Sequence, residues 1–175
     1  MATGSLIKID EEIVTSAVAS VELGGANWDS SYDVYMVKYN NVVASLDGTE
    51  EFRLRFLASS SADTSANYDS AYKQLRSDTT FANRSYTNQD HFLIGFIGAN
   101  TGERQNGILY LFNFNNASVY SFMTTEATTL NYSATLSGYQ GGGTLTVAQS
   151  TNGVQFYNSS TDIAQGTFTL YGLKK

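Results

Sequence analysis

Short segments in which apolar and polar residues alternate recur along this chain, and they restrict it to β-structure. The clearest segment is 52–56, where two phenylalanines and a leucine alternate with two arginines. The final one, 162–172, alternates Phe168 and Leu170 with threonines and a tyrosine, between Gly166 and Gly172. Side chains of a strand point alternately to its two faces, so each segment predicts a strand with one apolar face. We expect Phe168 and Leu170 to lie in the core.

Eight or more such segments, separated by turn signals, predict an all-β fold: an antiparallel, jelly-roll-like β-sandwich. At most one short helix is expected, over 67–75, because four apolar residues recur there at helical spacing. A polar loop should follow from Arg76 to Asp90. Turns are predicted at Asn40-Asn41, Asp47-Gly48, Asn115-Asn116, Gly138–Gly143 and Asn152-Gly153.

The chain has 175 residues, which suits one domain with a substantial core. Residues 1–26 form an extended, moderately apolar stretch that ends at Gly24-Gly25, and we predict an N-terminal arm or docking strand there. Such a strand can join the edge of another sheet through backbone hydrogen bonds. Residues 27–175 are then the β-sandwich domain.

Composition excludes several classes of protein. The absence of cysteine rules out disulfides, a thiolate nucleophile and a cysteine-ligated zinc site. The net charge of −6, with lysines and arginines scattered, argues against nucleic-acid binding. No stretch reaches the ~18 apolar residues of a membrane-spanning helix, so we expect a soluble protein without membrane insertion.

Charge is unevenly distributed along the chain. From Gln105 to Leu173 the only charged residues are Glu126 and Asp162. Depletion of charge is typical of the centre of a protein interface, which predicts that identical subunits cover much of this half. The alternative is a sheet whose surface is solvated by threonine, serine and asparagine, and the sequence leaves both readings open.

Residues with catalytic potential are few, and we predict no catalytic, cofactor-binding or metal site. His91 is the only histidine, and Asp90 should point to the opposite face of a strand that begins there. A structural histidine is therefore expected. The carboxylate pairs Glu11-Glu12 and Glu50-Glu51 lie beside predicted turns, where charge is simply solvated.

Aromatic residues near polar ones are the candidates for sugar binding, because a sugar ring stacks on an exposed aromatic face. The competing interpretation places these aromatics in the sandwich core or a trimer interface, and we favour it. The candidates are Trp28, Tyr32 and Tyr35, near Asp29 and Asp33, together with Tyr120 and Tyr139 near loops.

Three short motifs carry a family resemblance, in order along the chain. They are Ser31-Tyr32-Asp33-x-Tyr35, Phe52-x-Leu54-Arg55-Phe56, and the terminal Gly166-Thr-Phe-Thr-Leu-Tyr-Gly172 with Ile163 shortly before it. From about Ile13 onward, the chain resembles the small β-sandwich virion proteins of tailed bacteriophages that end on Gly-Thr-Phe-x-Leu-Tyr-Gly. No functional residues are defined for that group, so the resemblance transfers none.

The resemblance implies a non-enzymatic structural protein of the virion, made in the bacterial host cytoplasm. Members of this type assemble in several copies, often as homotrimers, into tail fibres, spikes, knobs, collars or capsid decoration. Expected partners are identical subunits and other phage structural proteins, the latter through residues 1–26. One alternative is a tail-appendage tip that binds a carbohydrate or receptor, with a host surface glycan as partner. The other is an envelope-degrading hydrolase with two carboxylates across a cleft.

Overall fold

A computed structural model describes residues 5–48, 50–78, 81–130 and 133–173. These residues form strands with one 3-10 turn, η1 (Gly25–Asn27), and no α-helix. The strands are β1 (Leu6–Val14), β2 (Ser20–Gly24), β3 (Val34–Ala44), β4 (Glu50–Ala58), β5 (Ser61–Ala62), β6 (Tyr68–Arg76), β7 (Ala82–Gln89), β8 (Phe92–Ile97), β9 (Gln105–Phe112), β10 (Tyr120–Leu130), β11 (Leu136–Ala148), β12 (Gly153–Asn158) and β13 (Ile163–Leu173).

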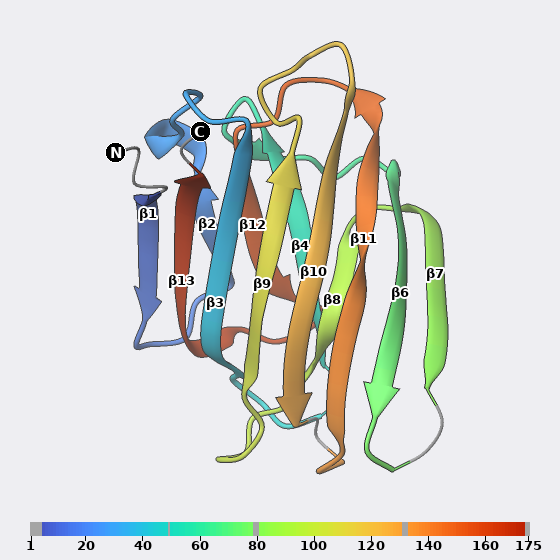
Figure 1. Cartoon of the computed structure of the whole chain (residues 1–175). Helices are drawn as coiled ribbons and strands as arrows, with labels where there is room; N and C mark the ends of the chain where they lie inside the picture. The colour runs from blue at the N-terminus through green and yellow to red at the C-terminus, as the bar shows by residue number, and fades with distance from the viewer. Residues whose placement is uncertain (1–4, 49, 79–80, 131–132, 174–175) are drawn as a thin grey trace.

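Two antiparallel sheets pack face to face, as the sequence predicts (Figure 1). The large sheet has eight strands in the order β1-β13-β3-β9-β10-β11-β6-β7. The small sheet has the order β2-β12-β4, after which β8 and β5 pair with successive parts of β4. The chain passes repeatedly from one sheet to the other, and this gives the jelly-roll-like sandwich.

The core lies between the sheets and is rich in aromatic rings. Phe52, Phe156 and Phe168 come from three strands, and each is completely buried. Their ring centroids lie 5.1–6.5 Å apart, within the range of favourable aromatic pairs. Leu170 is also fully buried, and β13 is the second strand from the edge of the large sheet. The inward face predicted for the terminal strand is therefore confirmed.

The predicted helix over 67–75 is wrong, because this segment is strand β6. Tyr68 and Tyr72 are four residues apart, a spacing that matches one turn of helix and also two periods of a strand. In the structure both tyrosines face inward, and β11 and β7 pair with the two edges of β6. The predicted loop 76–90 likewise contains β7. Pairing with neighbouring strands decided the structure here.

The glycines of 138–143 lie in the middle of β11 and not in a loop, contrary to the predicted turn. A β-carbon on Gly141 would lie 2.3 Å from the carbonyl oxygen of Ala71 on β6. A β-carbon on Gly143 would lie 2.5 Å from the ring of Phe92 on β8. The glycines therefore let neighbouring backbone and a core ring approach β11 closely.

The turn predicted at Asn40-Asn41 is also wrong, since β3 continues through both residues. The pairing of β3 with β9 shifts register between Tyr39 and Val42, which marks a bulge. Asn41 takes a positive φ of 55°, a conformation that asparagine tolerates. A residue pair typical of hairpin turns here bends a continuous strand.

The N-terminal segment contributes to both sheets. β1 pairs with β13 at the edge of the large sheet, and β2 pairs with β12 in the small sheet. Val14, Val21 and Leu23 are buried in the core. In this structure residues 5–26 are thus built into the sandwich, which differs from a separate arm. Docking onto a partner stays a prediction, for which the outer edge of β1 provides a terminal strand.

Candidate functional site: a groove on the outer face of the large sheet

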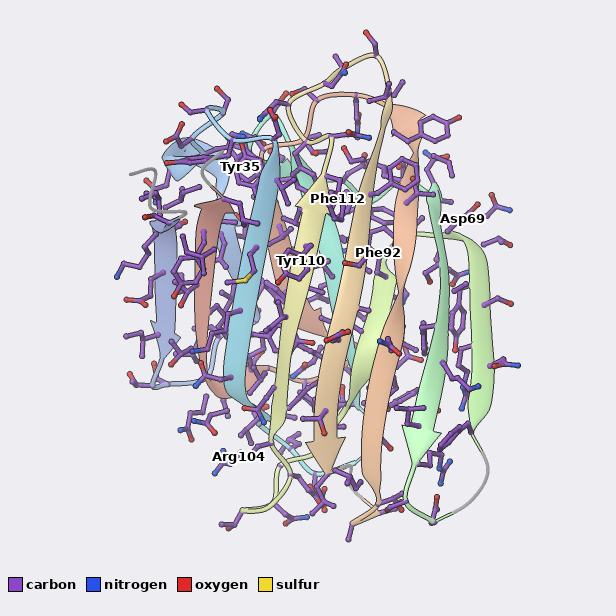
Figure 2. All side chains as sticks on the ribbon, in the orientation of Figure 1. Tyr35, Asp69, Phe92, Arg104, Tyr110 and Phe112 are labelled. Carbon is purple, nitrogen blue, oxygen red and sulfur yellow. The ribbon has the colours of Figure 1, made fainter. Side chains whose placement is uncertain are left out.

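The outer face of the large sheet carries a cluster of exposed aromatic rings. Tyr110 and Phe112 alternate with the buried Leu109 and Leu111 on β9, so both rings point away from the core (Figure 2). Phe122 on β10 is the direct cross-strand partner of Phe112. Tyr110 is 39% exposed and Phe122 is 43% exposed. Several large rings in one place on a surface mark an interaction site, whereas isolated ones do not.

Small residues beside these rings leave a depression in the sheet surface. Gly142 on β11 and Ala71 on β6 are cross-strand partners, and Gly142 also pairs with Thr124 on β10. The depression is lined on one side by Phe112 and Phe122 and on the other by residues of β6 and β7. Its volume of about 550 Å³ falls within the range of small-molecule sites.

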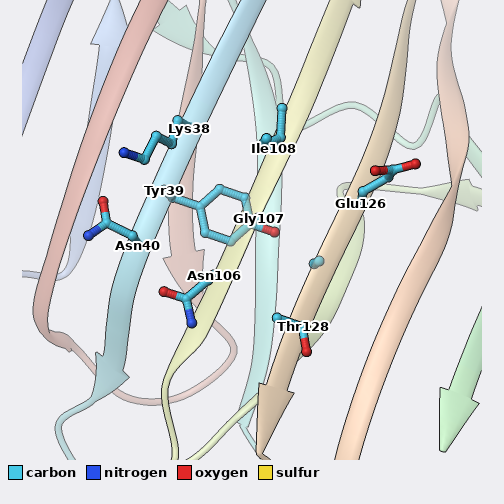
Figure 3. Close-up of a pocket in the computed structure, with 9 residues that line it drawn as sticks. Lys38, Tyr39, Asn40, Asn106, Gly107, Ile108, Glu126 and Thr128 are labelled. Carbon is cyan, nitrogen blue, oxygen red and sulfur yellow. The ribbon is translucent and has the colours of Figure 1, made fainter.

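Two further depressions continue it across the sheet. The first has Thr124 in common with the depression beside Phe112 and Phe122, and its lining also includes Gln140 and Glu126. The second shares Ile108 and Glu126 and reaches β3 (Figure 3). We call the three together the sheet groove. Its outward-facing lining includes Lys38, Asn40, Asp69, Ala71, Ser85, Asn106, Ile108, Tyr110, Phe112, Phe122, Thr124, Glu126, Thr128, Gln140, Gly142 and Thr144.

The sheet groove spans the strands from β3 to β7, five inter-strand spacings or about 24 Å. Its central strands, β9 to β11, carry one charged residue, Glu126. The amide of Gln140 donates a hydrogen bond of 3.1 Å to the Glu126 carboxylate. Lys38 on β3 and Lys73 on β6 flank this region and are exposed. The groove floor is therefore mostly apolar surface, interrupted by hydroxyl and amide groups and by few charges.

Most aromatics that the sequence suggested for sugar binding lie elsewhere. Tyr35 is fully buried, and the Trp28 and Tyr35 ring centroids are 4.0 Å apart. The Tyr35 hydroxyl donates to the backbone oxygen of Asp29 at 2.7 Å, and burial raises the pKa of this tyrosine. Tyr139 is buried in a second small cluster. Tyr120 is exposed but lies outside the groove lining. The interpretation as core residues agrees with the structure for Tyr35 and Tyr139, whereas Trp28 and Tyr32 are partly buried and pack against the core.

His91 lies on the other side of the sandwich, at the start of β8 in the small sheet. The prediction that Asp90 points away from it is wrong, because strand alternation begins only at Phe92. Nδ1 of His91 lies 2.6 Å from a carboxylate oxygen of Asp90. Burial opposes ionisation of Asp90, but hydrogen bonds from His91 and Arg55 outweigh it and lower the pKa of Asp90.

The second ring nitrogen of His91 does not fit a nucleophilic triad. Nε2 lies 4.0 Å from a carboxylate oxygen of Glu51, whereas a triad needs a hydroxyl or thiol at this position. Burial lowers the pKa of His91, which keeps the ring neutral near pH 7. The imidazole thus lies between the carboxylates of Glu51 and Asp90. Glu51 forms an ion pair with Arg53, and Asp90 forms one with Arg55. This is the geometry of a structural ion network.

The paired carboxylates are separated by their own contacts. Glu50 is buried and accepts hydrogen bonds from the hydroxyls of Ser159 and Ser160 at 2.9 and 2.6 Å. Glu51 pairs with Arg53, and Glu11 pairs with Lys8. Within the described ranges, no three His, Asp or Glu side chains are grouped to hold a metal ion. The same part of the chain contains no helix long and apolar enough to cross a membrane.

No protein-family model matches this chain, and no curated protein matches it. One similar solved structure is alginate lyase A1-II′, a member of polysaccharide lyase family 7, at 10% identity and a TM-score of 0.26. That match covers 87% of this chain and 66%, just under two thirds, of the lyase. Another is the CBM2 module of the evolved Dit of Lactobacillus casei BL23 phage J-1, at 8% identity and a TM-score of 0.26, covering 89% and 70%. TM-scores this low support no conclusion about function.

One feature of the sequence indicated the region of the groove. Depletion of charge from Gln105 onward coincides with β9, β10 and β11, which are adjacent in the large sheet. The particular rings could not be chosen from the sequence, because Tyr110 and Tyr35 both sit in alternating strands. The small sheet covers one face of each strand, and only the structure shows that Tyr35 lies on the covered face and Tyr110 on the exposed one.

Proposed function

We propose that this protein is a non-enzymatic structural component of a tailed-phage virion, which assembles as a homo-oligomer and acts through surface contacts. One observation carries the proposal: the β9–β11 face is almost free of charge and exposes large apolar side chains. The virion assignment is supported by the terminal Gly166–Gly172 motif and the two motifs upstream of it. The Asp90–His91 pair does not favour a hydrolase, since its free nitrogen faces Glu51.

We assign self-association to one end of this face. Leu130 and Leu136 are cross-strand partners, and Leu136 is 53% exposed. Leu75 projects from the same face of β6, and Phe81 lies near Lys73 on that strand. We call these four residues the apolar end patch, at the lower end of β6, β10 and β11 in Figure 1. Leu130 is eight residues from Phe122 along β10, or about 27 Å, so subunits meeting there leave the aromatic rings open.

Light scattering on the purified chain tests this assignment. We expect an oligomer, most simply a trimer with closed symmetry, at micromolar concentration. The double substitution Leu75→Ser, Leu136→Ser should shift it to the monomer because it removes exposed apolar area from the contact. The control is Ile13→Ser, which changes a more exposed apolar side chain on β1 at the opposite edge of the sheet.

The control should leave the oligomer intact. A monomeric wild-type chain would contradict the homo-oligomer, and an unchanged mass for the double variant would contradict the apolar end patch. Mass spectrometry of purified phage particles tests the virion assignment separately. Several copies of the chain per particle are expected, and failure to find the chain in particles would refute a structural role.

A further inference from the structure

The aromatic rings of the sheet groove come from two adjacent strands and form one platform. Phe112 and Phe122 face each other across β9 and β10, and Tyr110 lies two residues along β9 on the same face. The side chains of Tyr110 and Phe122 are roughly two-fifths exposed, because they lie on the face of the sheet that points away from the core. Flat rings held on a rigid sheet present apolar area with little conformational freedom to lose on binding.

Hydrogen-bonding groups follow the platform along the groove. Thr124 is the cross-strand partner of Tyr110, and Gln140 and Glu126 come next, joined by their 3.1 Å hydrogen bond. Ser85 on β7 contributes a hydroxyl on the far side of the lining, and Thr144 contributes one beside its cross-strand partner Phe122. A ligand that fits this surface has one apolar face for the rings and several neutral hydrogen-bonding groups at its rim.

The charge of the groove limits the ligand further. Glu126 is the one charged residue on β9 to β11, and the whole chain has a net charge of −6. A polyanion would meet a carboxylate at the centre of the groove and a negative protein around it. Nucleic acid would need a track of lysine or arginine along its phosphates. A neutral ligand is complementary to this surface.

The shape of the groove indicates a chain-like ligand. At the cross-strand pair Gly142 and Ala71 the groove has a narrow notch, because neither residue has a large side chain. In the other direction the groove extends across about 24 Å of sheet, so it is long and narrow. A second copy of this flat sheet would cover the rings without filling the notch, and it would bring a second Glu126 to the same surface. The apolar end patch accounts for self-association at another place.

We propose that the sheet groove binds a neutral, linear polysaccharide, whose sugar rings stack on Tyr110, Phe112 and Phe122. The sugar hydroxyls are hydrogen-bonded by Thr124, Gln140 and Glu126. This inference deepens the proposed function by giving the virion component a glycan ligand, and it rests on that function for its biological setting only. Binding itself requires nothing beyond the folded chain.

Affinity electrophoresis of the full chain tests the proposal, with gels containing laminarin, dextran, mannan or hydroxyethylcellulose as neutral probes and alginate as the polyanion. We expect at least one neutral polymer to retard the wild-type chain, and alginate to retard it less. Tyr110→Ala and Phe122→Ala should each weaken that retardation at least tenfold. Tyr120→Ala, which removes an equally exposed ring outside the groove, should change it less than twofold.

Circular dichroism and light scattering of each variant separate the remaining outcomes. Loss of binding with unchanged spectrum and mass supports the proposal. No retardation by any neutral polymer, stronger retardation by alginate, or full retardation of both groove variants would overturn it. Dissociation of the oligomer by Tyr110→Ala or Phe122→Ala would also overturn it, because the groove would then be a subunit contact. The double variant of the apolar end patch should bind glycan while monomeric, so the two proposals fail independently.

Discussion

Replacing Gly141 with alanine should destabilise the sandwich, although alanine normally suits a strand better than glycine. The added β-carbon would lie 2.3 Å from the Ala71 carbonyl oxygen and 2.5 Å from the Tyr72 α-carbon. Both are backbone atoms, which cannot turn away as a side chain can, so β11 and β6 must separate locally. Overpacking of this kind costs about 1–3 kcal/mol, and a strained ladder hydrogen bond adds roughly 1 kcal/mol.

Alanine has less conformational freedom than glycine in the unfolded chain, and this offsets about 0.5–1 kcal/mol of the cost, which leaves a net loss of about 1–3.5 kcal/mol. For a chain of this size each kcal/mol shifts the melting temperature by about 2–4 °C, so we expect a decrease of about 2–14 °C. The matched control is Gly138→Ala on the same strand, whose nearest contact would be Leu75 at 3.5 Å. Its melting temperature should stay level or rise.

Calorimetry at one fixed protein concentration measures both variants, because association also shifts melting. Equal melting temperatures for Gly141→Ala and Gly138→Ala would refute the reasoning. So would a more stable Gly141→Ala.

Three further outcomes follow from the core, the N-terminus and the ion network. Phe168→Ala removes a fully buried ring and should lower the free energy of unfolding by about 3–5 kcal/mol in urea titration, whereas Phe122→Ala on the surface should cost far less. Deleting residues 1–24 removes β1 and β2 with three core side chains, so cooperative thermal unfolding should be lost; a sharp transition in the truncated chain would contradict this. His91 has a pKa below its usual 6.5, so unfolding takes up a proton in acid, and stability should fall as the pH decreases below about 6.5. His91→Gln should flatten that decrease, and an unchanged pH slope would show that His91 is not its source.

The sequence predicted strands well where one face is apolar and the other polar. In β4 and β13 the inward residues Phe52, Leu54, Phe168 and Leu170 are all fully buried. The buried face of such a segment can be predicted without knowing which strands pair with it, because the alternation of apolar and polar residues already identifies that face. The sandwich architecture follows from having many of them.

Prediction failed where a pattern has two structural uses. The four-residue spacing of Tyr68 and Tyr72 suits a helix turn or a strand, and glycine suits a loop tip or a close approach between strands. Only the neighbours decide: β11 beside β6, and Phe92 above Gly143. The full extent of the sheet groove was hidden because its ends depend on long-range pairings, of β3 with β9 and of β6 with β11.

The pairing of β13 has a consequence for how the protein is made. β13 lies between β1 and β3, so the last of the thirteen described strands fills a gap between the first and the third. The edge of β3, complete at Ala44, must wait about 120 residues for Ile163 to emerge, or about 6–24 s at ribosomal rates. Until then one edge of β3 is an unpaired template for other chains. The large sheet therefore closes only after β13 has emerged from the ribosome, so a product that stops before Ile163 leaves β1 and β3 unjoined.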